Sequence, residues 1–174
     1  GPQQGISQAA RGGAAHIAME HFKQRTGVRI VHVPYKGTAQ ALTDVISGQV
    51  AMTMTGAPPL MPHLQAGSLR ALGVSGLHRV EALAQVPTIA ESGVPGFDAT
   101  QWYGVVAPAG TARPVVEKLN REIRAILASP AMRERLRSEG AIATTGTPEE
   151  FAVFIRSEIA RWAAVIASAG IRPD

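Results

Sequence analysis

Short apolar runs alternate with segments of helical period through the first half of the chain. Residues 28–33 are rich in β-branched side chains and end at Pro34, which predicts a buried strand. Residues 50–54 and 70–74 are bounded by turn residues in the same way, and they predict two further strands. We therefore expect a series of short buried strands here.

The segments between these runs carry the signals of helices. Apolar residues at helical spacing follow Thr38 and stop at Gly48, a residue typical of a helix C-cap. Pro58 and Pro59 stand at the entry of a further short helix, where proline is tolerated. Strands separated by short helices are usually joined by right-handed crossovers, so the pattern predicts an α/β fold with a parallel sheet.

The second half of the chain has a different pattern. Prolines and glycines interrupt residues 79–96, which predicts a long connection with one short helical stretch at 88–91. Residues 101–107 predict a strand that stops at Pro108. Two helices are then expected to begin at Thr111 and Ser129, because proline follows each residue within the first turn.

Residues 147–150 form the clearest local signal, a capping box that contains proline at the first helical position. The helix behind it is expected to end at Gly170. Its apolar stripe consists of Phe151, Phe154, Ile155, Ile159, Trp162 and Ile166. One strand is too little sheet for three helices, so we expect residues 98–174 to belong to a second lobe whose other strands lie outside this sequence. Phe151, Phe154 and Trp162 are then expected to lack partners.

Composition and charge narrow the class of protein. Apolar residues make up 45% and charged residues 17% of the 174 residues, which is typical of a globular protein. No apolar run reaches the roughly 18 residues of a membrane span. The net charge of +4 is dispersed, few residues are aromatic, and glutamates lie among the arginines of residues 113–137. Nucleic-acid binding is therefore not expected.

The residues suited to catalysis do not form a recognisable set. Cysteine is absent, which excludes disulfides and thiolate metal sites. His16 and His21 would diverge by about 140° on a helix and cannot share a metal. Neither a His-Glu-x-x-His motif nor a Gly-x-Ser-x-Gly elbow occurs. An α/β enzyme using His16 or His32 stays as an alternative, but no acid or nucleophile accompanies either histidine.

Three glycine-containing turns offer a better site. Residues 12–16 lead into a helix, residues 35–38 join a strand to a helix, and residues 55–57 follow the next strand. Helix N-termini bind carboxylates and phosphates, and turns after neighbouring parallel strands meet at one edge of the sheet. The alternative explanation is that these are ordinary connections in which glycine serves only the backbone conformation.

The sequence resembles the substrate-binding proteins of tripartite tricarboxylate transporters, known as the Bug family. The similarity runs from about residue 12 to the end, and residues 1–7 do not share it. It rests on spaced motifs in a fixed order, at residues 32–37 (His-Val-Pro-Tyr-Lys-Gly), 41–44, 47–50, 62–63, 67–72, 86–91, 93–96, 102–104, 107–111, 119–120 and 146–151.

The resemblance implies a periplasmic-binding-protein-like, two-lobed fold of the Venus-flytrap kind. Residues 1–97 would form most of the second lobe. Residues 98–174 would be the returning C-terminal part of the first lobe, helical with one strand, and the hinge would lie near residues 97–101. The implied location is the periplasm. No signal peptide is evident at the start of the sequence, so we expect that any such segment was removed or lies upstream.

The implied function is extracytoplasmic solute binding. Such a protein captures a small mono-, di- or tricarboxylate or related acid and delivers it to the membrane permease subunits of a tripartite tricarboxylate transporter. The resemblance implies no enzymatic activity and no cofactor. A ligand-sensing module that serves a signalling receptor is the alternative.

The family holds its ligand largely through backbone N–H groups, waters and hydroxyls of loops after strands. Carried over to this sequence, the ligand-binding residues would be Gly12, Gly13, Ala14, His16, Tyr35, Gly37, Thr38, Ala39, Thr55 and Gly56. The stretch 13–15 lacks the family's usual serine or threonine, which leaves the ligand's identity open. We also expect self-association, because the stripe with Phe151, Phe154 and Trp162 is large for a monomer.

Overall fold

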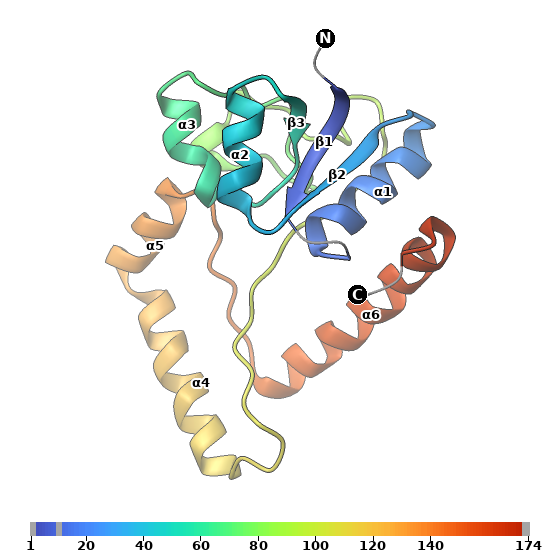
Figure 1. Ribbon diagram of the computed structural model, residues 1–174. Coiled ribbons are helices and arrows are strands. Elements are labelled where there is room, and N and C mark those ends of the chain that lie inside the picture. The colour runs from blue at the N-terminus through green and yellow to red at the C-terminus, as the bar shows by residue number, and fades with distance from the viewer. Residues whose placement is uncertain (1–2, 10–11, 172–174) are drawn as a thin grey trace.

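A three-stranded parallel sheet organises the N-terminal half of the chain. The structure, a computed structural model, describes residues 3–9 and 12–171. Strands β1 (Gln3–Ala9), β2 (Val31–Tyr35) and β3 (Val50–Thr53) lie in the order β2-β1-β3 (Figure 1). Ala9 pairs with Tyr35 and Ser7 pairs with Thr53, so the three strands end at the same edge. This edge is called the carboxyl edge below.

The central strand β1 lies partly in the segment for which the sequence showed neither a strand nor a family resemblance. Its residues are mostly polar or small, and Ile6 is the one large apolar side chain. Ile6 is almost completely buried. The position of β1 comes from pairing with two other strands, which local sequence does not reveal.

The strand predicted at residues 50–54 is confirmed as β3, but other predicted strands need correction. The first runs from Val31 to Tyr35, not 28 to 33, and includes Pro34. Proline is tolerated there because β2 lies at the edge of the sheet. Residues 70–74 form no strand, and only Val74 makes an isolated bridge, to Thr88. The helical stretch predicted at 88–91 is absent, since residues 89–93 form turns; Thr88 Oγ1 accepts from Glu91 N and Glu91 Oε2 accepts from Thr88 N.

Helices cover the sheet. Helix α1 (Ala14–Thr26) joins β1 to β2, and α2 (Thr38–Ile46) joins β2 to β3. These two connections run in opposite directions along the sheet, so right-handed crossovers put α1 and α2 on opposite faces. The short segments η1 (Pro58–Leu60), α3 (Met61–Gln65) and η2 (Glu81–Leu83) follow. The predicted parallel α/β arrangement is therefore present.

The C-terminal half contains α4 (Arg113–Ala128), α5 (Pro130–Ser138) and α6 (Pro148–Ala169). The predicted capping box is confirmed, since Glu150 N donates to Thr147 Oγ1 and Thr147 N donates to Glu150 Oε2. Ser129 caps α5 as predicted, whereas α4 begins at Arg113, two residues after Thr111. No helix of the described residues is long and apolar enough to cross a membrane.

Helix α6 finds partners within the chain, contrary to expectation. Trp162 packs against the buried cluster of Ala18, Phe97 and Ala99, and Gln24 Nε2 on α1 donates to Ser168 Oγ at 2.8 Å. The other end of the stripe packs on Trp102, whose ring centroid lies 5.8 Å from that of Phe151 and 5.1 Å from that of Phe154. The expectation of missing partners was wrong because sequence periodicity does not show contacts between distant segments.

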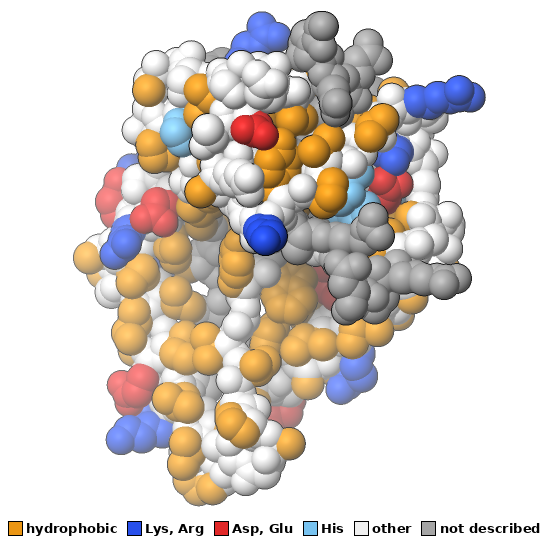
Figure 2. Space-filling view, in the orientation of Figure 1, with side chains coloured by type: hydrophobic (Ala, Val, Ile, Leu, Met, Phe, Trp, Pro, Cys, Tyr) orange, Lys and Arg blue, Asp and Glu red, His pale blue; other side chains and the backbone are white. Residues whose placement is uncertain are grey.

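Residues 101–107 are extended but form no strand in the described structure. Their apolar side chains stay open to solvent, with Tyr103 80%, Val105 70% and Val106 78% exposed. Figure 2 shows apolar side chains gathered over the lower part of the molecule, where α4 and the extended segments lie. Val115, Leu119 and Ile126 of α4 contribute to this exposed apolar surface.

Candidate ligand site at the carboxyl edge of the sheet

The strand order defines where a ligand is expected to bind. The chain leaves β1 toward β2 and then returns across the sheet to β3, so β1 and β3 flank a reversal of direction. Open α/β sheets bind ligands outside the carboxyl ends of their strands at such a point. Tyr35 is the last residue of β2, and the other predicted site residues lie in the segments that follow the three strands. In Figure 1 this edge faces the extended segments that lead to α4 and α6.

The loop after β1 is held by a buried histidine. Gly12 has a φ of 78°, in the left-handed region that favours glycine, and its N–H donates to His16 Nδ1 at 3.0 Å. The His16 ring stacks on the ring of His32, with centroids 4.0 Å apart. Gly13 is the N-cap of α1 and Ala14 its first residue. His16 therefore supports the loop from within the fold, and glycine at the N-cap provides no side chain to cap the first turn.

The loop after β2 contributes a second helix N-terminus. Gly37 is the N-cap of α2, and Thr38 and Ala39 begin the helix. The Tyr35 hydroxyl donates to Asp44 Oδ2 at 2.6 Å, which raises the pKa of Tyr35 chiefly through this hydrogen bond, with smaller effects of burial and the Asp44 charge. Because its hydrogen is committed to Asp44, Tyr35 ties the end of β2 to α2. Gly37, Thr38 and Ala39 stay candidates for ligand contact.

The loop after β3 brings in two residues that the sequence did not single out. A Cβ on Gly56 would lie 3.2 Å from Gln101 Oε1 and 3.6 Å from the Tyr103 hydroxyl. Thr55 precedes this glycine and is half-buried. Gln101 and Tyr103 lie 45 or more residues after Gly56 in the sequence, so no local signal could have identified them as its neighbours. They belong to the segment 98–104, called the linker below.

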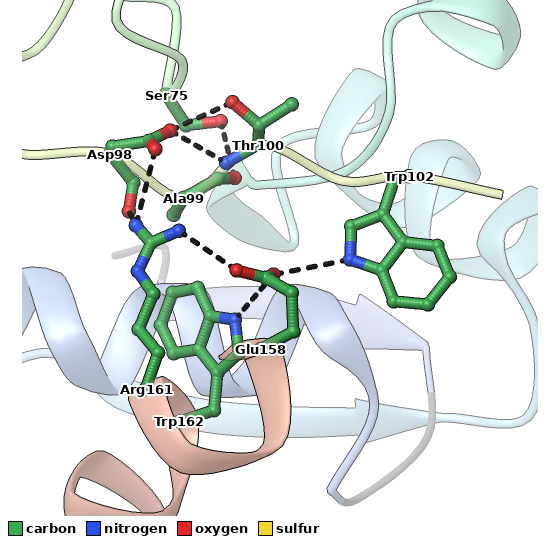
Figure 3. A network of polar contacts seen from close by, with 8 residues as sticks. All are labelled: Ser75, Asp98, Ala99, Thr100, Trp102, Glu158, Arg161 and Trp162. Atoms are coloured by element: carbon green, nitrogen blue, oxygen red, sulfur yellow. Dashed lines mark hydrogen bonds and ion pairs between the residues drawn. The ribbon is translucent and has the colours of Figure 1, made fainter. Parts of the chain in front are cut away.

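A polar network holds the linker against the rest of the molecule (Figure 3). Ala99 N donates to Ser75 O at 2.7 Å, and Ser75 Oγ donates to Ala99 O at 3.1 Å. Asp98 Oδ1 accepts from Thr100 N and Thr100 Oγ1 at 3.1 and 2.7 Å. These contacts fix the first part of the linker beside the α/β unit.

Helix α6 supplies the other half of the network (Figure 3). Arg161 pairs with Asp98 Oδ2 at 3.2 Å and with Glu158 Oε1 at 3.2 Å, and it also donates to the Asp98 carbonyl. Glu158 Oε2 accepts from Trp102 Nε1 at 3.1 Å and from Trp162 Nε1 at 3.0 Å. The network therefore joins the linker to α6 on the side opposite Gly56.

A separate concavity of about 720 Å³ lies between α4, α5 and residues 141–145. Four arginines line it (Arg121, Arg124, Arg133 and Arg137), and none of the predicted site residues does. Arg137 pairs with Glu81 and Glu134 at 2.7 and 2.6 Å, which ties α5 to η2. Among the described residues, no group of three or more His, Asp or Glu side chains is arranged to hold a metal ion.

Sequence comparison gives the relatives of this chain. The family of the tripartite tricarboxylate transporter receptors matches residues 6–171. The chain is 39% identical to Protein BugT of Bordetella pertussis over 163 residues, which are 94% of this chain and 50% of BugT. It is 31% identical to a UPF0065 protein of Pseudomonas knackmussii, from the clcB-clcD intergenic region, over 91% of this chain and 94% of that protein. The chain spans about half the length of most curated relatives it matches.

Solved structures resemble the chain over nearly its whole length. R. palustris Rpa4515 with adipate gives a TM-score of 0.92 at 40% identity, and the match covers 99% of this chain and 58% of that one. MatC (Rpa3494) from Rhodopseudomonas palustris with bound malate gives a TM-score of 0.80 at 29% identity. This match covers 95% of this chain and 57% of MatC. The resemblance found in the sequence is confirmed and extends to residue 6, and the relatives are receptors and binding proteins, not enzymes. The chain has the α/β fold of periplasmic binding proteins and belongs to the tripartite tricarboxylate transporter receptor family.

Proposed function

We propose that this chain is the part of a solute-binding protein that holds a small carboxylate at the carboxyl edge of β1, β2 and β3. The observation that carries the proposal is the meeting of three loops after parallel strands at one edge, in a chain of this family. Two of these loops lead into helix N-termini, whose N–H groups and dipole favour an anion. Gly12, Gly13, Ala14, Gly37, Thr38, Ala39, Thr55 and Gly56 are the proposed contacts.

The ligand class and the partners follow from the relatives. Adipate is bound in Rpa4515 and malate in MatC, which supports a carboxylate as the ligand of this chain. In this proposal residues 1–97 and 98–174 belong to different lobes, which close over the ligand about residues 97–101. The liganded protein would then deliver the acid, in the periplasm, to permease subunits of a tripartite tricarboxylate transporter.

A thermal-shift screen tests carboxylate binding. Adipate, malate, succinate and citrate are compared with the uncharged adipamide, each at rising concentration. A ligand at about 100 times its dissociation constant adds about 2.7 kcal/mol of stability, so at least one acid is expected to raise the melting temperature while adipamide leaves it unchanged. A protein that responds to none of the acids would contradict the proposal.

The site itself is tested by Gly37→Val. No atom lies within 4 Å of the position that a Cβ would take, and the φ of −170° is extended backbone, so the fold is expected to accept the change. The new side chain would stand at the carboxyl edge and weaken acid binding. Gly73→Ala is the control, because its Cβ would make ordinary contacts with Ile89 and Pro87. Unaltered acid binding by Gly37→Val would remove the α2 N-terminus from the site.

A further inference from the structure

The linker presents two different faces because side chains alternate along an extended backbone. Trp102 and Gly104 face α6, since Trp102 Nε1 donates to Glu158 Oε2 and a Cβ on Gly104 would overlap the Phe151 ring. Gln101 and Tyr103 point the other way, toward Gly56 in the loop after β3. The network that holds Trp102 on α6 therefore also sets the direction of Gln101 and Tyr103.

The absence of a side chain at Gly56 makes room for this pair. Gln101 Oε1 lies 3.2 Å from the position of the missing Cβ, which is closer than most Cβ contacts in proteins. Gln101 Nε2 donates to the Tyr103 hydroxyl at 2.9 Å. Any larger residue at position 56 would displace the Gln101 amide and with it the hydrogen bond to Tyr103.

The hydrogen bond leaves Tyr103 as a donor. Its oxygen already accepts from Gln101, so its own hydrogen points elsewhere, and within the described residues no acceptor takes it. The side chain is 80% exposed, which leaves the hydroxyl accessible. A hydroxyl that accepts one hydrogen bond becomes a better donor for the next, and a carboxylate is the strongest common acceptor.

We propose that Tyr103 is a ligand-contacting residue, which donates its hydroxyl hydrogen to the distal carboxylate of a dicarboxylic acid. Gln101 is the positioning residue for this hydroxyl, and Gly56 keeps the space that the pair occupies. The N-termini of α1 and α2 hold the other carboxylate of the same acid, called the proximal one. This inference therefore rests on the proposed function. It assigns the site to dicarboxylates in preference to monocarboxylates of the same chain length.

Calorimetric titration of matched acids tests the role of Tyr103. Adipate is compared with hexanoate and succinate with butyrate, because each pair differs by one carboxylate. The wild-type protein is expected to prefer the dicarboxylate in at least one pair. Tyr103→Phe removes only the hydroxyl and is expected to weaken that dicarboxylate about tenfold while leaving its monocarboxylate partner unchanged. Val106→Ala, on a similarly exposed side chain just beyond the linker, is the control and should keep wild-type affinities.

A double-mutant cycle tests the positioning role of Gln101. Gly56→Ala is expected to weaken dicarboxylate binding several-fold by displacing the amide. In a protein that already carries Gln101→Ala, the same change should have no further effect, because no amide is left to displace. The readout is the ratio of the affinity for the dicarboxylate to the affinity for the monocarboxylate. A purely structural change would lower both affinities and leave their ratio unchanged.

Each outcome bears on one proposal or on both. If the wild-type protein prefers a dicarboxylate and Tyr103→Phe binds it equally well, the inference fails and the proposed function stands. The inference is also overturned if Tyr103→Phe weakens the binding of both acids of a pair equally. A wild-type preference for monocarboxylates overturns it too. A wild-type protein that binds no carboxylate overturns the proposed function, and the inference with it.

Discussion

At Gly104 the absence of a side chain is needed for packing. A Cβ at this position would overlap Phe151 Cζ and lie 3.0 and 3.1 Å from the two Cε atoms of the ring. Gly104→Ala is therefore expected to lower the free energy of unfolding by about 1–3 kcal/mol, as is usual when extra atoms enter a packed contact. Urea denaturation followed by circular dichroism measures the change.

Gly73→Ala is the matched control for this prediction. Its Cβ would lie 3.4 Å from Ile89 Cγ1, within ordinary contact, and its φ is not in the left-handed region. We expect this variant to differ from the wild type by less than about 0.5 kcal/mol. If both alanine variants were equally stable, Phe151 would not be packed on Gly104 in solution.

His21 is expected to make stability depend on pH. Burial lowers the pKa of His21 below its usual 6.5, and the nearby Arg25 and Arg161 lower it further, against an opposing effect of Asp98. Its ring stacks on Phe97, and within the described residues Nδ1 has no hydrogen-bond partner. The unfolded chain therefore takes up a proton more readily than the folded one, so stability should fall as pH drops below about 6.5.

Urea denaturation midpoints at pH 7.5 and 5.5 measure this effect. The loss of stability at the lower pH should be smaller in His21→Phe, because the substituted ring cannot be protonated. His78→Asn changes an exposed histidine and leaves the half-buried His21 ring in place, so it should retain the wild-type loss. Equal losses in wild type and His21→Phe would show that other groups cause the dependence.

At the level of elements, α6 depends on one carboxylate for its contact with the linker. Glu158 accepts from two indole N–H groups and pairs with Arg161, and its side chain is only 11% exposed. Glu158→Gln keeps the shape but loses the charge, and it is expected to cost about 1–3 kcal/mol of unfolding free energy. Urea denaturation followed by circular dichroism provides the measurement.

Glu117→Gln is the control at this scale. Glu117 pairs with Arg113 four residues earlier on α4, and both side chains are more than half exposed. Exposed pairs of this kind contribute little, so the variant should lie within about 0.5 kcal/mol of the wild type. Equal effects of the two substitutions would argue against the linker contact as a source of stability.

The elements that sequence predicted well are those with local signals. Thr147 and Glu150 cap α6 through two hydrogen bonds within four residues, and Ser129 caps α5. Strand β1 was missed because its place in the sheet depends on pairing with distant strands. Residues 70–74 have the composition of a strand, yet the described structure gives them only one bridge.

The candidate site also combines residues with local sequence signals and residues placed by contacts between distant segments. The turns at Gly13, Gly37 and Gly56 were predictable, because glycine at the end of a strand and the start of a helix is a local signal. Gln101 and Tyr103 could not be predicted, since their place beside Gly56 is set by contacts between the linker and α6.

At the scale of the whole molecule, the exposed apolar surface favours self-association. Val105 and Val106 are 70% and 78% exposed, and Ile142 is also 78% exposed. Extended segments with open apolar side chains tend to pair with other chains. We expect this chain to form dimers or larger assemblies, which light scattering coupled to size exclusion can measure.

Two variants that each add one lysine distinguish association through residues 105 and 106 from nonspecific association. Val106→Lys puts a charge on the exposed segment and should shift the distribution toward the monomer. Gln85→Lys adds the same charge at an exposed position elsewhere and should leave the wild-type distribution in place. A monomeric mass for the wild-type chain would count against self-association.

The two indoles that meet at Glu158 also make the protein its own optical probe. The chain has two tryptophans, and both donate to this one carboxylate, one from the linker and one from α6. All tryptophan emission of the unlabelled molecule therefore originates at the junction that any rotation about residues 97–101 would disturb. Separation of Trp102 from Glu158 would replace a fixed negative charge beside one indole with water and shift the emission maximum. Stopped-flow recording could then follow the proposed closure over a ligand in real time, without an attached dye.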